Sequence, residues 1–307
     1  MKDIRKTING IIIFGALMAG IDMAVGMIGE WMVRKQPDFG GNITKDNYRM
    51  NRLVGDIVFV GSSRTAHHYA IPVLQDSLDL VCTTPHTAFN AGRGGLFFDN
   101  TCCVIESLLE RCTPSLIVME ATDESWTTEI IQTLNLCRWS YKSNKVYREY
   151  VERQGWKEQL LCHINMYRFN GSFYKFLSNI LKPGQEYDGY EPLTGEMKVM
   201  PEEKDTALAD VTISDYSLEN FHRVLSKCRD KGCKIVVAAS PRFGHKAENE
   251  RTAAVCAEYG VPYIDMESDA YFNENPQLFR DAGHLNDNGA RIYTSMFFTQ
   301  LKPYLDF

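Results

Sequence analysis

Four short stretches of the sequence combine side chains that could carry out nucleophilic chemistry. An apolar run over residues 56–61 leads into Gly61-Ser62-Ser63-Arg64, and later apolar runs lead into residues 90–95 and 120–123. Asp281 and His284 follow, just before the last helical stretch. A serine hydroxyl attacks an ester when a base takes its proton, a carboxylate orients that base, and hydrogen-bond donors stabilise the oxyanion. These residue types therefore indicate acyl transfer.

The spacing of the residues suggests a role for each of them. We expect Ser63 to be the nucleophile, His284 the general base and Asp281 the carboxylate that orients the imidazole, because three residues of separation let both lie in one turn. The backbone N–H groups of Ser63 and Gly95 would point at the oxyanion, since a glycine lets the backbone approach without a Cβ in the way.

These residues are far apart in sequence, so the fold must bring them together at one edge of a sheet. From residue 56 onward, short β-rich runs alternate with stretches of helical periodicity, and this order is typical of a parallel sheet with helices on both faces. Ligands of such sheets bind beyond the carboxyl ends of the strands. The sequence thus predicts an α/β fold, a three-layer doubly wound parallel sheet, with strands at 56–61, 86–92, 115–121, 233–240 and 261–266.

The alternation is interrupted once, which sets the expected organisation of the chain. Residues 123–213 contain helical runs, three tryptophans and a loop rich in glycine and proline, and we interpret them as a partly helical insertion. We expect a cytoplasmic tip and anchor over residues 1–33, a linker over 34–55, and one domain with this insertion over 56–307. Aromatic residues of the insertion could stack on sugars, but such clusters more often form a core.

The motifs resemble those of the SGNH, or GDSL, hydrolases over residues 55–307. The family's Gly-Asp-Ser-Leu motif is similar to Gly61–Arg64, its Asn-x-Gly-x-x-Gly turn is similar to Asn90–Gly95, and its Asp-x-x-His motif matches Asp281 and His284, in the family's order. The resemblance implies a serine esterase or acyltransferase with an SGNH-like, flavodoxin-like fold. It also places the nucleophile at Ser63 rather than Ser62.

One motif departs from the family pattern. The family's Gly-x-Asn-Asp motif supplies an asparagine to the oxyanion hole, and the corresponding residues here are 120–123, with Thr122 as the remaining side-chain donor. Losing such a donor costs about 10²–10³ in rate elsewhere. The Gly-Ser-Ser variant resembles membrane-tethered members that handle O-acyl groups on cell-envelope polysaccharides, and we expect the acyl group here to be O-acetyl. The alternative is an inactive member that binds glycan or an envelope assembly partner.

The N-terminus carries a candidate membrane anchor. Residues 8–33 are apolar except for Asn9, Asp22 and Glu30, and they are long enough to cross a hydrocarbon core of ~30 Å. A buried core helix and a signal peptide cleaved near residues 24–26 are the alternatives. We favour an uncleaved single-pass anchor in the cell membrane, with a cytoplasmic N-terminus because basic residues precede the span. Asp22 would then need a partner helix or a local water defect, and it is the one indication of a membrane partner protein.

The net charge and the cysteine content limit which other classes of protein and kinds of site are possible. A formal net charge of -6 argues against nucleic-acid binding, which needs clustered positive charge. Nine cysteines without a Cys-x-x-Cys pair resemble neither a disulfide framework nor a zinc site, and they fit a cytosolic protein slightly better than an oxidising exterior. The turn at residues 92–95 could hold a phosphate, but it follows the second strand and lacks an acidic ribose partner. We expect no cofactor and no metal.

Several further residues could line the site. We expect Arg64, Asn90 and Arg93 to contact an acylated glycan or a small ester, with the arginines binding an anionic group or pairing with Asp99 and Glu120. Arg242 and His245 could flank the mouth of the pocket. His67 and His68 cannot both face one metal from a helix, and we interpret them as part of a solvated helix face.

Overall fold

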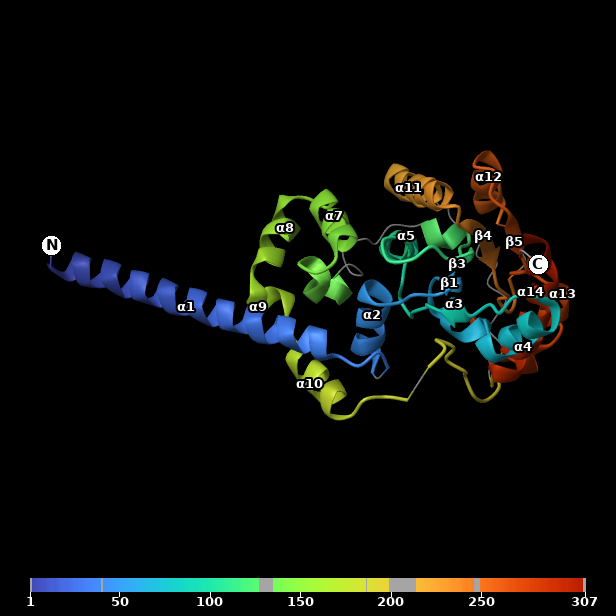
Figure 1. Cartoon of the computed structure of the whole chain (residues 1–307), viewed down its shortest axis with the longest axis horizontal. Coiled ribbons are helices and arrows are strands. Elements are labelled where there is room, and N and C mark those ends of the chain that lie inside the picture. Colours follow the sequence, from blue (N-terminus) through green and yellow to red (C-terminus); the bar gives the residue numbers. More distant parts are fainter. Residues whose placement is uncertain are drawn as a thin grey trace. The chain divides into compact units, whose positions relative to one another are not determined.

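The computed structural model describes residues 2–39, 41–126, 135–185, 187–198, 214–245 and 249–305. The chain divides into two compact units, which are described separately below (Figure 1). The first unit comprises Met1–Arg52 and Leu134–Glu186, and the second comprises Leu53–Thr133 and Tyr187–Phe307.

The second unit is built on a parallel sheet. Within the described residues it has five strands in the order β2-β1-β3-β4-β5, and every neighbouring pair is parallel. The strands are β1 (Ile57–Val60), β2 (Ala88–Asn90), β3 (Leu116–Glu120), β4 (Lys234–Ala239) and β5 (Tyr263–Asp265). This order is that of the doubly wound, flavodoxin-like sheets, and it confirms the predicted fold class.

Helices cover both faces of this sheet (Figure 1). Strand β1 is buried on both sides, which is why it consists of four consecutive apolar residues rather than an alternating pattern. Ile57 and Phe59 belong to a large apolar cluster with residues of α4 and α14, whereas α5 and α11 pack against each other and contact β1 and β4. The principal helices of the unit are α3 (Ser63–His68), α4 (Ile71–Val81), α5 (Phe98–Leu109), α11 (Asp215–Lys231), α12 (Glu250–Glu258) and α14 (Asp287–Leu301).

Shorter elements complete the second unit near the carboxyl ends of the strands. A two-stranded antiparallel ribbon pairs Asp281 with His284 directly, ahead of α14. The shorter elements are η1 (Asp123–Trp126), α13 (Ala270–Asn273), η3 (Pro276–Leu278), β6 (Phe279–Asp281), β7 (His284–Leu285) and η4 (Lys302–Tyr304).

The first unit is helical throughout its described secondary structure. Its elements are α1 (Lys2–Lys35), α2 (Asn42–Asn51), η2 (Asn135–Tyr141), α7 (Lys145–Arg153), α8 (Trp156–His163), α9 (Asn165–Arg168) and α10 (Phe173–Leu181). The inserted helices pack on the C-terminal half of α1 and on α2, with Trp139, Phe169 and Phe176 in the small core. The predicted helical insertion is thus present in residues 135–185, while residues 199–213 lie outside the described residues.

The structure differs from the expected linker at residues 34–55. Helix α2 occupies much of this segment, and its residues Asp46, Asn47 and Met50 are buried against the insertion. Several polar side chains of this stretch make hydrogen bonds to the rest of the unit, such as that from Asn51 Nδ2 to Ser140 Oγ at 2.9 Å. The polar residues, glycines and proline of this segment predicted a linker, but residues 42–51 form a packed helix.

Helix α1 is long and apolar enough to cross a membrane. The most apolar 18-residue window within Ile4–Lys35 has a mean hydropathy of 2.2, and only 6% of that window is buried. Length and composition are the whole of this evidence. A buried core helix would be largely covered, so the exposure of α1 argues against that alternative.

Candidate active site

The turn that carries the predicted nucleophile, Ser63, follows β1 directly. Ser62 is the extended N-cap residue of α3, and Ser63 is the first residue of that helix. Gly61 must be glycine here, because a Cβ on it would lie 2.2 Å from Thr65 Oγ1 and 2.6 Å from Glu120 Cβ. As the first residue of a helix, Ser63 also has a backbone N–H without an intrahelical acceptor.

His284 lies against Ser63 and Asp281. Its Nε2 is 2.8 Å from Ser63 Oγ, and its Nδ1 is 2.9 Å from Asp281 Oδ1. When Nδ1 carries the ring proton and donates it to Asp281, Nε2 is free to accept the proton of Ser63. The three groups that the sequence predicted as a triad are therefore in hydrogen-bond contact, although 221 residues separate Ser63 from His284.

The turn at residues 90–95 closes over α3. Asn90 is fully buried, and its side chain donates to the carbonyls of Thr65 and Tyr69 and accepts from the Gly92 N–H at 2.9 Å. Gly92 is pressed against α3, since a Cβ there would lie 2.3 Å from the Ala66 nitrogen. Asn90 thus holds the turn in place, and both N–H donors of its amide are used within the protein.

Arg64 is half-buried and lies between two buried carboxylates at the wall of the site. Its Nη1 lies 2.5 Å from Glu267 Oε1, and its Nε lies 3.6 Å from Glu120 Oε1. Burial lowers the pKa of Arg64, but the attraction of Glu120 and Glu267 outweighs it, so the pKa lies above its ordinary value. Arg64 is thus a permanent cation, and the expected pairing with Glu120 is present.

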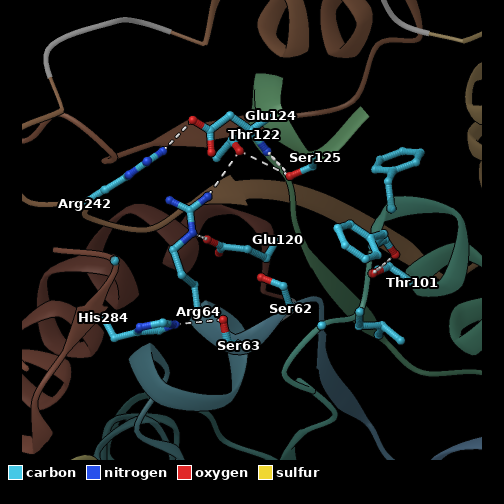
Figure 2. A pocket seen from close by; sticks show the side chains of 15 residues that line it. Ser62, Ser63, Arg64, Thr101, Glu120, Thr122, Glu124, Ser125, Arg242 and His284 are labelled. Carbon is cyan, nitrogen blue, oxygen red and sulfur yellow. Dashed lines mark hydrogen bonds and ion pairs between the residues drawn. The ribbon is translucent and has the colours of Figure 1, made fainter. Parts of the chain in front are cut away.

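Thr122 is placed by Arg64 and Ser125. Arg64 Nη2 donates to Thr122 Oγ1 at 3.2 Å, and the Ser125 hydroxyl lies 3.2 Å from the same oxygen. Ser125 Oγ also accepts from the Thr122 backbone N–H at 2.9 Å. These contacts hold the Thr122 side chain at the wall of the cavity, as Figure 2 shows.

A buried polar network supports the strand ends behind Arg64. The Leu285 N–H donates to His68 Nε2 at 3.0 Å, so the ring proton is on Nδ1 and is donated to Ser240 Oγ at 2.8 Å. Ser240 donates in turn to Glu120, which also accepts from the Tyr69 hydroxyl. Burial, together with the charge of Arg64, holds the pKa of His68 well below its ordinary value, so the ring is neutral. Burial raises the pKa of Glu120, and Arg64 offsets part of that effect.

The interpretation of His67 and His68 as a solvated helix face was wrong. His68 is completely buried, and His67 is half-buried, with its Nδ1 at 2.6 Å from the Glu191 carbonyl and its ring edge-on to His284. Two adjacent helix residues diverge by about 100°, which here sends the His68 ring into the core and the His67 ring against that of His284.

These residues surround a cavity of about 330 Å³ (Figure 2). Of the predicted site residues, the cavity wall includes Ser63, Arg64, Gly95, Thr122 and His284, and Asp281 lies behind His284. The wall does not include Asn90 or Arg93, and Arg93 Nη1 donates to the neighbouring Gly94 carbonyl. The remaining lining residues are Ser62, Leu96, Phe97, Phe98, Thr101, Glu120, Glu124, Ser125, Arg242 and Gly283.

Some of these residues could not be assigned from the sequence. Ser125 and Glu267 belong to none of the sequence motifs. They are recognised as site residues only because Ser125 contacts Thr122 and Glu267 pairs with Arg64. Arg242 was expected at the mouth of the pocket, and it lies there, paired with Glu124 at 2.7 Å. His245 lies instead at Glu267 Oε2, at 3.4 Å.

The tryptophans of the insertion region divide between core and surface. Trp126 and Trp139 are buried in the cores of the second and first unit respectively, as is usual for aromatic clusters. Trp156 is 76% exposed on α8.

Among known proteins, no family profile matches the chain, and no curated protein sequence matches it. Its structure is similar to that of an acetyl xylan esterase, with 14% identity over 80% of this chain and 98% of that one (TM-score 0.41). It is also similar to a lipase/acylhydrolase from Enterococcus faecalis, with 11% identity over 81% and 96% (TM-score 0.41). A two-domain esterase active on acetylated mannans is 12% identical over 89% of this chain and 56% of its own (TM-score 0.45). These similarities assign no activity to the chain.

Proposed function

We propose that the protein is a membrane-anchored serine esterase or O-acyltransferase that acts on O-acyl groups of cell-envelope glycans. The observation that carries this proposal is the hydrogen-bonded series Asp281, His284 and Ser63, with distances of 2.9 and 2.8 Å, at the wall of a cavity. A hydroxyl, an imidazole and a carboxylate in this order are the groups that serine acyl transfer requires.

The reaction follows from this geometry. Ser63 Oγ attacks the ester carbonyl while His284 Nε2 takes its proton, and the resulting imidazolium gives that proton to the departing sugar oxygen. The acyl group is then held as an ester on Ser63. Water, or a hydroxyl of an acceptor sugar, loses a proton to His284 and attacks this ester, which releases acid or acylated product and restores the serine.

We further infer that Thr122 replaces the family's asparagine as an oxyanion donor. Its oxygen accepts a hydrogen bond from Arg64, and a hydrogen bond from the Ser125 hydroxyl would occupy its second lone pair. The Thr122 proton would then point into the cavity. With the N–H groups of Ser63 and Gly95, this arrangement supplies three donors, and the nearby Arg64 cation adds to the positive potential.

The size and lining of the cavity favour a small acyl group on a polar carrier. Leu96, Phe97 and Phe98 form an apolar side next to Ser63, whereas Glu124 and Arg242 form a polar rim. A volume of about 330 Å³ for the whole site accommodates an acetyl group and part of a sugar, and it is small for a long acyl chain.

The direct test is active-site labelling of the full chain in detergent with a fluorophosphonate probe. We expect labelling of the wild type, loss of labelling in Ser63→Ala and His284→Ala, and retention in the matched control Ser62→Ala. Deacetylation of an acetylated oligosaccharide, followed by mass spectrometry with and without an acceptor sugar, separates hydrolysis from transfer. Labelling that persists in Ser63→Ala contradicts the assignment. Glycan binding without any turnover would favour the inactive binding protein instead.

We also propose that α1 is a single-pass anchor of the cell membrane with a cytoplasmic N-terminus. The exposed apolar stretch of α1 and the basic residues Lys2, Arg5 and Lys6 before it support this orientation. A reporter enzyme that is active only outside the cytoplasm, fused to the C-terminus of the full chain, should be active. Activity of a cytoplasmic reporter at that position would reverse the topology.

A further inference from the structure

Helix α11 ends in a turn that brings two cysteines together. Gly232 has a φ of 68°, in the left-handed region that favours glycine, and its N–H donates to the Arg229 carbonyl at 3.0 Å. The N–H of Cys233 reaches further back and donates to the Cys228 carbonyl at 2.8 Å. These two hydrogen bonds define a Schellman motif, in which the side chains at the positions of Cys228 and Cys233 pack against each other. Two thiols separated by four residues therefore become neighbours.

The two thiols are in hydrogen-bond contact. The Cys228 thiol donates to the Cys233 sulfur, and the Cys233 thiol, when protonated, donates to the Lys234 carbonyl at 3.4 Å. Both cysteines are free. A disulfide needs its two Cβ atoms close together and facing each other, and the turn supplies this arrangement without a rearrangement of the chain.

The contact makes the two thiols unequal. The hydrogen bond from Cys228 lowers the pKa of Cys233 below its ordinary value, although burial alone would raise it. The same hydrogen bond, together with burial, raises the pKa of Cys228. By comparison, burial raises the pKa of Cys256, a buried cysteine of α12, to about 12. Because the thiolate is the reactive form, Cys233 is the more nucleophilic thiol of the pair.

The pair can be reached from solvent. Cys228 and Cys233 line a surface pocket of about 330 Å³ between the end of α11, the start of β4 and the segment before β5. Arg229 and Lys234 also line it, and their positive charges favour a thiolate. This pocket lies at the amino ends of β4 and β5, whereas the candidate active site lies beyond the carboxyl ends of the strands. The thiols therefore have no part in the proposed esterase chemistry.

We propose that Cys228 and Cys233 form a dithiol site that a small disulfide oxidant converts into an intramolecular disulfide. The Cys233 thiolate attacks one sulfur of the oxidant, which breaks the S–S bond of the oxidant, releases one thiolate and leaves a mixed disulfide on Cys233. Cys228 then loses its proton to water and attacks the Cys233 sulfur, which releases the second thiolate. Two protein thiols are thus oxidised, and one oxidant disulfide is reduced to two thiols.

The test treats the full chain in detergent with oxidised glutathione, stops the exchange with acid and alkylates the remaining thiols under denaturing conditions. Cleavage after glutamate releases residues 220–248, in which Cys228 and Cys233 are the only cysteines. Mass spectrometry of this peptide distinguishes an internal disulfide, a mixed disulfide with glutathione and two alkylated thiols. The variants are Cys228→Ser and Cys233→Ser, and Cys256→Ser is the matched control, because it removes a buried thiol elsewhere in the unit.

We expect the wild-type peptide to lose two hydrogen atoms and to regain them with dithiothreitol, and Cys256→Ser to behave in the same way. In Cys228→Ser the glutathione mixed disulfide should accumulate on Cys233, since no second thiol displaces it. In Cys233→Ser, Cys228 should acquire glutathione several-fold more slowly.

Two alkylated thiols in the treated wild-type peptide would overturn the proposal, and so would a bridge from either cysteine to a third one. Equal rates of glutathione addition in the two serine variants would overturn the assignment of Cys233 as the attacking thiol. The wild-type measurement decides the main proposal even if a serine variant fails to fold. Because no readout uses esterase activity, the result is independent of the proposed function.

Discussion

Thr122 has a shorter side chain than the asparagine of the family motif, and its neighbours decide what its hydroxyl can do. Arg64 and Ser125 both contact Oγ1, and in the proposed arrangement, in which Ser125 donates to Oγ1, the Thr122 proton would be available for a developing oxyanion. A short donor can thus serve where a longer one is usual, provided that a second layer of residues orients it.

Thr122→Val tests this role, because it preserves shape and removes the hydroxyl. If Thr122 donates in the transition state, kcat should fall about 10²–10³-fold with a much smaller change in KM. Steady-state turnover of an aryl acetate measures both. Thr122→Ser keeps a hydroxyl and should retain most activity, and a Thr122→Val enzyme with wild-type kcat would exclude Thr122 from the oxyanion hole.

At the scale of elements, the site depends on how closely the turn at residues 90–95 packs on α3. Asn90 secures the turn by three hydrogen bonds, and Gly92 lets the two backbones approach. Asn90 and Gly92, which resemble the family's Asn-x-Gly pattern, therefore hold the backbone of the turn in position and are not placed to contact a substrate.

Gly92→Ala should destabilise the fold by about 1–3 kcal/mol, because the new methyl group would overlap backbone atoms of α3 that cannot move independently. Gly94→Ala is the matched control, since its Cβ would meet nothing closer than Ser63 Cβ at 4.0 Å. Thermal unfolding of both variants in detergent compares them. Equal melting temperatures would show that the close approach does not limit stability.

The buried network around His68 predicts a pH dependence of stability. The pKa of His68 is depressed in the folded protein, so below its unfolded value of about 6.5 the unfolded chain binds a proton that the folded chain does not. This contribution to stability is present above pH 6.5 and declines by up to about 1.4 kcal/mol per pH unit below it, until the folded pKa is reached.

His68→Gln removes this titration while keeping a donor and an acceptor. The melting temperature of the wild type should fall more steeply between pH 6.5 and 5 than that of the variant, although the variant starts lower. Glu120 also titrates with a raised pKa, but it is common to both proteins and cancels in the comparison. Parallel curves would mean that His68 does not titrate differently on folding.

At the scale of the whole molecule, the insertion and the N-terminal segment form one unit, although about 80 residues of the sheet unit separate them in sequence. Asp22, Gly26, Gly29 and Glu30 all contact the insertion. Asp22, Glu30 and two of the five glycines of the candidate anchor thus lie in its C-terminal part, where it packs on protein.

Gly29→Leu should disrupt this packing, because Phe169 is buried and its ring cannot move aside. We expect faster cleavage of the insertion by a protease added to the detergent-solubilised full chain. Gly20→Leu, at a position with nothing within 4 Å, should be cleaved at the wild-type rate. Identical cleavage of the two variants would argue against a structural role for this contact.

The sequence by itself determined the strands, the order of the motifs and the three residues, Ser63, Asp281 and His284, that the structure brings into hydrogen-bond contact. Apolar runs, and the polar, glycine and proline residues that end them, are local properties of a sequence. Five parallel strands and the residues at their carboxyl ends could therefore be predicted without knowledge of the fold. The Asp-x-x-His pattern is also a local property, because a three-residue spacing places the carboxylate and the imidazole in one turn.

Only the tertiary structure decided which polar residues are buried and what each of them contacts. Ser125, Glu267 and His68 carry no local signal, and Asn90 was expected at the substrate but lies within the protein. The polar segment at residues 42–51 likewise became a helix through contacts with residues about 90 positions away, such as that between Asn51 and Ser140. Hydrogen bonds between distant parts of a chain depend on the packing of whole elements, and no local pattern of residue types encodes them.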